Sequence, residues 1–253
     1  MANVVERIDH LLITTEMPHD GFRFFTDVLK LPEAWPMTSY GGYFSSGGIA
    51  IGPIKFFKRL GLAPSADGIL GIAFEPRNDL NEVIKQLQEE KLKYSRPREF
   101  RSKGEHMWTN VSLKGFLPRA WIFFCQYEFD SNQEKEKNNE ELYKRKGGAL
   151  GIKRIEEITI HYKNKKILRN WETLLCNKAE KTESEYRFKL NDGVSINLVH
   201  SNKNVITSFT LKVEKLEAIR HFLVNHSIRY KDYGKTISIF PHALTGTKIR
   251  FVE

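Results

Sequence analysis

The sequence predicts an α+β fold built from a duplicated module. The same strand pattern occurs near the start of each half of the chain, in Arg7–Ile13 and again in Arg154–Ile160. Aliphatic and polar residues alternate in both stretches, which is typical of a strand with two different faces. Each stretch leads into an amphipathic helix, and a similar order of strands and helices follows in both halves. This half-chain repeat makes His10 and Glu157 equivalent positions and indicates the fold more strongly than any single motif.

In the first half, apolar residues at helical spacing predict a helix from Pro18 to about Lys30. A proline at its start costs little, because the first-turn amides have no helical partners. Two short strands follow near residues 42–45 and 48–54, with a Gly47-Gly48 hairpin turn between them. A second round of strand, helix and strands is expected at 68–75, 78–91, 108–113 and 120–128.

The segment Phe129–Gly148 is rich in Glu, Lys and Asn, and we expect it to be a partly helical connection. It predicts a first module over residues 1–130, a charged linker over 131–150 and a second module over 151–253. The second module repeats the order of the first with shorter loops, and Asn191-Asp192-Gly193 is typical of a hairpin turn. Its strands are expected at 155–161, 185–190, 194–200, 205–213, 236–240 and 248–252, and its helices at 165–176 and 214–226.

Composition limits the function classes. The formal net charge is +9, but the basic residues are spread through the chain and mixed with Glu, and no nucleic-acid-binding signature appears. A solvated basic surface is therefore favoured over a nucleic-acid partner, and a basic pocket for an anionic small molecule is a third reading. No apolar run approaches the roughly 20 residues that cross a bilayer. Without a signal pattern, and with Cys125 and Cys176 in apolar contexts, a cytoplasmic protein without a membrane partner is expected.

Four stretches carry a resemblance to a known family. They are Ile8–Ile13 and Gly71–Glu75, each followed by a helix, then Ala120–Glu128 and the tail from Ile239 to Val252. With these the chain resembles the vicinal oxygen chelate superfamily, which includes glyoxalase I, extradiol dioxygenases, methylmalonyl-CoA epimerase and bleomycin-resistance proteins. The resemblance implies two tandem βαβββ modules, whose mixed sheets curl into cups that form a cleft.

The resemblance also implies where a divalent metal would lie. Members commonly hold one in the cleft with His, Gln and Glu from the first, fourth and last strands of a module, and it acts as a Lewis acid. In the first half these positions are His10, Gly71 and Gln126, with Glu128 next on the same face. Gly71 offers no ligand, so the set is incomplete.

In the second half the three positions are Glu157, Ser208 and Arg250. Arg250 would repel a metal, and we expect it to pair with Glu157. Alternatively, Glu157 completes a site shared between the modules. The metal ligands would then be His10, Gln126, Glu128 and Glu157, and the metal Mn, Zn, Fe, Ni or Mg. A protein without any metal is the other reading.

Five residues are candidates for substrate binding. An aromatic ring at Tyr43 or Trp108 can stack on a flat substrate, and His106 lies beside the same cleft. Gln126 can bind an amide or carbonyl without a metal, and Arg98 can hold a carboxylate or phosphate. Core packing or an exposed loop is the structural alternative for each.

Two functions follow from these residues. In the first, His10 with Gln126 or Glu128 binds a divalent metal or moves a proton, in lyase or isomerase chemistry next to a carbonyl. A dioxygenase is less favoured, because the two-His-one-carboxylate set for iron is incomplete. In the second, the protein is a metal-free binding protein of the bleomycin-resistance type, which suits its seventeen Phe residues. In both the partner is a small molecule, and the chain is a monomer or a homodimer.

Overall fold

The computed structural model describes most of the chain, in eight stretches: 3–40, 44–51, 54–58, 68–102, 104–176, 179–182, 185–240 and 246–253. The first half contains β1 (Val5–Thr15), α1 (Pro18–Arg23) with a π-helical turn (Phe24–Val28), β2 (Glu33–Tyr40), β3 (Phe44–Ile49), β4 (Ile54–Lys58), β5 (Gly68–Pro76), α2 (Leu80–Glu89), β6 (Lys93–Tyr94), β7 (Arg98–Ser102), β8 (Glu105–Lys114) and β9 (Trp121–Tyr127).

The rest begins with α3 (Ser131–Lys144), which occupies the segment expected to be a linker and buries Leu142. A 3-10 turn (Gly148–Leu150) precedes the second half. Its elements are β10 (Ile152–Tyr162), α4 (Lys165–Leu175), β11 (Glu180–Lys181), β12 (Glu185–Lys189), β13 (Ser195–His200), β14 (Val205–Val213), α5 (Leu216–Asn225), β15 (Tyr230–Asp232), β16 (Ile237–Ile239) and β17 (Lys248–Val252).

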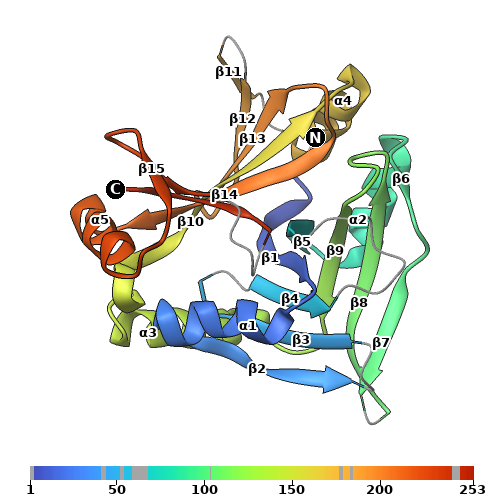
Figure 1. The fold of residues 1–253 in the computed structure, drawn as a ribbon. Helices are drawn as coiled ribbons and strands as arrows, with labels where there is room; N and C mark the ends of the chain where they lie inside the picture. The colour runs from blue at the N-terminus through green and yellow to red at the C-terminus, as the bar shows by residue number, and fades with distance from the viewer. Residues whose placement is uncertain are drawn as a thin grey trace. The chain divides into compact units, whose positions relative to one another are not determined.

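The strands form two mixed sheets with matching order (Figure 1). Hydrogen bonds connect them as β2-β3-β4-β1-β5-β9-β8-β6 and as β11-β12-β13-β10-β14-β17-β16-β15, with β7 paired to β8. The pairs β1–β4, β5–β9 and β14–β17 are parallel, whereas the hairpin partners are antiparallel. The α+β class is confirmed. The order βαβββ occurs once in the first half, as β1 to β4, and twice in the second half, whereas α2 is followed by four strands, β6 to β9.

One local prediction is wrong. Gly47 and Gly48 lie inside β3 and not in a hairpin turn. A side chain has no room at either position, because a Cβ on Gly48 would lie 2.6 Å from the Trp35 ring and one on Gly47 would lie 2.8 Å from the Phe22 ring. Glycine within a strand often marks such a close approach, and here aromatic packing explains the pair.

The chain divides into two compact units, and each draws on both halves of the sequence. The first comprises Met1–His10, Gly71–Ser131 and Thr159–Ile206, and the second Leu11–Leu70, Asn132–Ile158 and Thr207–Glu253. Strands β1, β5, β10 and β14 therefore contribute to both. The boundaries at residues 130 and 151 stay a prediction about the sequence repeat.

In the first unit, helix α4 supplies the largest buried ring. Asn164 caps this helix by accepting the Lys166 amide, and Trp171 on its apolar face is fully buried. The Trp171 ring meets Phe74 edge-on at 6.1 Å and Phe116 at 5.2 Å between centroids. Aromatic edge contacts of this kind add to the hydrophobic gain of burial. A helix of the second half thus packs against Phe74 of β5 in the core of the first unit.

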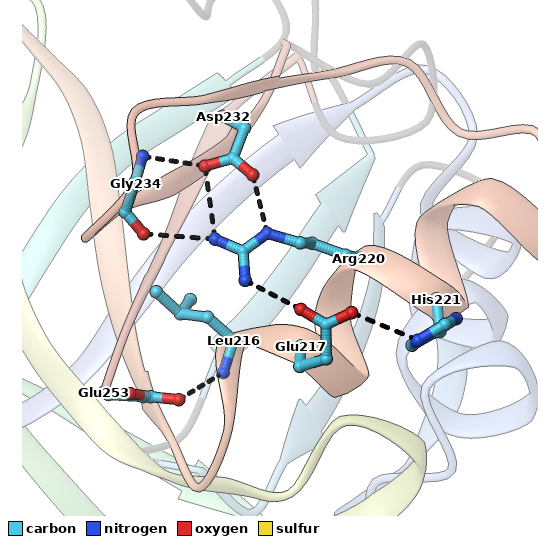
Figure 2. Close-up of polar contacts among 7 residues, drawn as sticks. All are labelled: Leu216, Glu217, Arg220, His221, Asp232, Gly234 and Glu253. Carbon is cyan, nitrogen blue, oxygen red and sulfur yellow. Dashed lines mark hydrogen bonds and ion pairs between the residues drawn. The ribbon is translucent and has the colours of Figure 1, made fainter.

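In the second unit, Arg220 joins α5 to the chain around β15 (Figure 2). Its Nε lies 2.6 Å from Asp232 Oδ2, its Nη1 lies 3.0 Å from Glu217 Oε2, and it also donates to the Gly234 carbonyl. The hydrogen bond from Arg220 lowers the pKa of Asp232. At the start of α5, the Glu253 carboxylate accepts the Leu216 amide at 2.8 Å. No helix within the described residues is long and apolar enough to cross a membrane.

Candidate functional site

Strand β1 brings a buried carboxylate–imidazole pair into the first unit. His10 is 2% exposed, and its Nδ1 contacts Asp9 Oδ2. The edge of the His10 ring meets Phe123 at 5.8 Å between centroids. The phenol of Tyr127, from β9, donates to the same Asp9 oxygen at 2.8 Å. We call Asp9, His10 and Tyr127 the Asp9 cluster.

Electrostatics keeps the Tyr127 phenol of this cluster protonated. Burial, and then the negative charge of Asp9, raise the pKa of Tyr127 well above its usual value, so Tyr127 is a neutral donor. A carboxylate beside Nδ1 favours the His10 tautomer that carries its proton there, which makes Nε2 the basic nitrogen. The cluster is thus chemically suited to accept or return a proton at His10 Nε2.

Strand register places more candidates on the same face as Tyr127. Trp108 on β8 lies directly opposite Tyr127 on β9, and Asn110 lies opposite Cys125. Directly opposite residues of an antiparallel pair share a face of the sheet. Arg98 on β7 is in turn opposite Asn110. We call the face that carries Arg98, Trp108, Asn110 and Tyr127 the first polar face, and the Asp9 cluster adjoins it through Tyr127.

Three side chains of this region, Arg98, Phe100 and Trp108, pack against one another. Trp108 stacks on Phe100 with centroids 5.2 Å apart and planes inclined by 13°. The Arg98 guanidinium lies over the Phe100 ring, 5.2 Å from its centroid. His106 Nδ1 lies 3.2 Å from Glu128 Oε1, and Glu128 is 46% exposed. The structure therefore brings Arg98, Trp108 and His106 into one region of the first unit, whereas Tyr43 lies outside the described residues.

Sequence reasoning missed Asn110. Its amide oxygen is buried and has no hydrogen-bond partner among the described residues. Most buried polar groups are paired, so an orphan acceptor on a polar face is a candidate for binding a ligand donor. The available signal was the two-residue spacing from Trp108, which places both side chains on one face.

Gln126 lies on the other face of β9. Its Oε1 accepts the Leu80 amide at 2.7 Å, at the first residue of α2. Asp79 accepts the next two amides, Asn81 at 2.7 Å and Glu82 at 3.1 Å. Gln126 therefore helps to satisfy the orphan amides of a helix N-terminus, and the residues that alternate with it on β9 are the ones that share a face with Trp108.

Gly71 is fixed by backbone packing. It pairs with Trp121 in the parallel ladder between β5 and β9. A Cβ built on Gly71 would lie 2.2 Å from the Trp121 carbonyl oxygen. No side chain of any kind fits there without moving β9, so this position cannot supply a ligand.

In the second unit, Glu157 pairs with Arg250, as predicted from the sequence. Glu157 is buried on β10, and its Oε1 lies 3.5 Å from Arg250 Nη1 on β17. Ser208, the remaining residue of the three positions expected to hold a metal, is buried on β14. A cation therefore stands beside the carboxylate that was proposed as a metal ligand.

These residues do not fit a divalent metal. Such ions need several oxygen or imidazole ligands together, yet in the described part of the chain no three His, Cys, Asp or Glu side chains converge. Two of the potential donors are engaged elsewhere, Gln126 Oε1 with an amide and Glu157 with Arg250, which leaves His10 Nε2 and Glu128 as an incomplete ligand set. The described residues therefore offer no complete site for a metal-dependent step.

Comparison with known proteins shows the fold. Neither a protein-family profile nor a curated protein sequence matches the chain. A hypothetical protein from Staphylococcus aureus matches with a TM-score of 0.66 and 18% identity, over 96% of this chain and 97% of that one. An extradiol ring-cleaving dioxygenase from B. fuscum matches with a TM-score of 0.70 and 11% identity, over 100% and 72%. The fold is of the vicinal oxygen chelate type.

A third match is the 2,3-dioxygenase LapB from Pseudomonas sp. KL28, with a TM-score of 0.67, 12% identity and coverage of 100% and 93%. At such identities the likeness concerns the fold alone. The reaction, if any, has to be inferred from the residues present in this chain.

Proposed function

We propose that this protein binds a flat small molecule on the first polar face, without a resident metal. The observation that carries the proposal is the register of β7, β8 and β9, which aligns Arg98, Trp108 and Asn110 with Tyr127 on one face. An aromatic ring for stacking, a cation and an unpaired amide acceptor are what a ligand with a ring and a polar edge requires.

The neighbouring groups support binding without a metal. Gly71 has no room for a ligand side chain, and Gln126 caps α2. The three potential metal positions of the first half thus reduce to His10, whose Nδ1 faces Asp9. A face that is polar and aromatic but lacks converging metal ligands favours the binding function over the metal-dependent one.

The matching strand orders of the two sheets support a tandem repeat. We propose that the repeat boundaries are those expected from the sequence, with modules over 1–130 and 151–253. Helix α3 then forms most of the connection between the modules. It is rich in charged residues, and Leu142 is its buried residue.

A second function is favoured by the Asp9 cluster. A histidine oriented by a carboxylate is the usual arrangement of a general base. In this reading His10 Nε2 removes a proton next to a carbonyl of the bound molecule, Asp9 orients the ring, and Tyr127 holds Asp9 in place. This is lyase or isomerase chemistry without a metal.

A ligand screen tests the proposal. A ligand that prefers the native state raises the melting temperature, so we would screen flat carbonyl-bearing compounds by thermal shift. Hits should lose at least half of their shift in Trp108→Leu and in Asn110→Ala. The matched controls are Tyr143→Leu and Asn139→Ala, because both residues are exposed on α3.

Two results decide between the readings. If no compound shifts the melting temperature, or if hits keep their full shift in both face variants, the binding proposal fails. If a hit is also converted to product by the wild-type protein but not by His10→Gln, the catalytic function applies.

A further inference from the structure

We infer that the second unit has a separate site for an anionic group, a carboxylate or phosphate of a small molecule, on β14, β17 and β16. Cross-strand register builds it: Thr210 pairs with Arg250, and Arg250 pairs with Ser238. Paired positions on adjacent strands project from the same face. Arg250 is thus flanked by two hydroxyl groups, and we call these three residues the Arg250 row.

The two hydroxyls have no partner in the part of the chain that the structure describes. Thr210 and Ser238 are each 3% exposed, and Thr210 Oγ1 and Ser238 Oγ make no hydrogen bond there. Leaving a buried hydroxyl unpaired destabilises a folded protein. Two such groups on either side of one guanidinium are unusual in a purely structural core, and each can donate a hydrogen bond to an anion oxygen.

Arg250 has more N–H donors than its ion pair with Glu157 uses. Its side chain is 33% exposed, and Nη1 lies 3.5 Å from Glu157 Oε1. A guanidinium carries five N–H donors, and its planar fork matches carboxylates and phosphates. One carboxylate at this distance therefore orients the side chain without exhausting it.

The surrounding charge favours an anion. Lys248 lies two residues before Arg250 on β17, opposite Ser208, and strand alternation places it on the same face. Lys231 on β15 lies opposite Ser238. Arg250, Lys248 and Lys231 are three cationic side chains along the row, and the ion pair places one carboxylate, that of Glu157, beside Arg250, so these charges together favour an anion.

This site does not depend on the first polar face, so it is tested with its own probes. Isothermal titration calorimetry at low ionic strength would compare benzoate and inorganic phosphate with benzamide, a neutral analogue of benzoate. We expect at least one anion to bind and benzamide to bind about tenfold or more weakly, because charge-assisted hydrogen bonds to Arg are lost. Which anion binds tells a carboxylate ligand from a phosphate ligand.

Variants locate the binding. Arg250→Met should weaken anion binding by about tenfold or more, whereas Arg154→Met should leave it unchanged. Arg154 is the matched control, because it forms an ion pair with Glu156 on β10 of the same unit. Thr210→Val and Ser238→Ala should weaken binding while the unliganded melting temperature stays level or rises, because each removes an unpaired buried hydroxyl. These two variants decide the matter if Arg250→Met does not fold.

Three outcomes would overturn the inference. They are no binding of either anion at millimolar concentration, equal binding of benzoate and benzamide, and binding that survives in both Arg250→Met and the hydroxyl variants. Trp108→Leu should not change anion binding. Ligands that depend on Trp108 would keep the proposed function intact even if the Arg250 row bound nothing.

Discussion

Arg250 Nη1 lies 3.5 Å from Glu157 Oε1, and the two residues come from the last and the first strand of the second half. The resemblance to the vicinal oxygen chelate superfamily places metal ligands at both positions. In this chain the two positions hold an ion pair, in which the charges of Glu157 and Arg250 compensate each other. It also leaves the hydroxyls beside Arg250 as donors for something else.

The pair predicts a measurable coupling. Arg250→Met leaves a buried carboxylate without its cation and should destabilise the protein by about 1–3 kcal/mol. Glu157→Gln should cost less, because Arg250 is partly exposed. A double-mutant cycle from chemical denaturation should give a coupling of about 1 kcal/mol, and the exposed pair Arg154–Glu156 should give about 0–1 kcal/mol. A coupling between Glu157 and Arg250 that is indistinguishable from zero would show that the pair is incidental.

Gln126 should behave as a helix cap. Gln126→Ala removes the acceptor of the Leu80 amide and should lower the free energy of unfolding by about 0.5–2 kcal/mol, as the loss of a capping group does. Asp79→Ala should have a similar effect at the same helix end. Urea denaturation measures both, and an unchanged midpoint for Gln126→Ala would refute the capping role.

Tyr127 predicts alkaline sensitivity. Its pKa is raised in the folded state, so folding favours the neutral phenol. The stability from this group is fully present below about pH 10, the unfolded pKa, and is lost as the pH rises through the folded pKa. Tyr127→Phe should cost about 1 kcal/mol at neutral pH and should flatten the loss of stability above pH 10. Tyr143→Phe, at an exposed tyrosine, should leave the pH profile as it is; a Tyr127→Phe profile identical to that of the wild type would contradict the account.

Gly71 should tolerate no side chain. Gly71→Ala places a Cβ 2.2 Å from the Trp121 carbonyl oxygen and should destabilise the protein by about 3 kcal/mol or more, in the range of severe packing conflicts. Gly104 has open space around its Cα but a φ of +88°. Gly104→Ala should therefore cost only about 1 kcal/mol of backbone strain. Thermal unfolding of the two variants would compare them, and equal stability would mean that β9 moves easily.

Local patterns made much of the fold predictable. The helix expected at 78–91 is observed as α2, Leu80–Glu89, with Asp79 as its cap. The pairing of Glu157 with Arg250 was expected from the ligand positions that the family resemblance implies. The role of Gln126 was not predictable, because its partner Leu80 lies 46 residues away and the contact depends on which face of β9 it occupies.

Packing between distant segments explains the other differences. Gly47 and Gly48 read as a turn in sequence, but they lie in a strand because aromatic rings from elsewhere occupy the side-chain space. The two-residue spacing already placed Asn110 on the same strand face as Trp108, but it gave no sign of an unpaired acceptor. The ladder that sets Asn110 opposite Cys125 is needed to show that Tyr127 shares this face.

Metal content tests the central claim of metal-independent binding most directly. The tag-free protein would be soaked in manganese(II), zinc(II) or iron(II), desalted and measured by mass spectrometry beside His10→Ala. The account predicts far less than one metal per chain, with no difference between the two proteins. A near-stoichiometric metal that is lost in His10→Ala would contradict it and would restore the metal-dependent lyase or isomerase as the leading function.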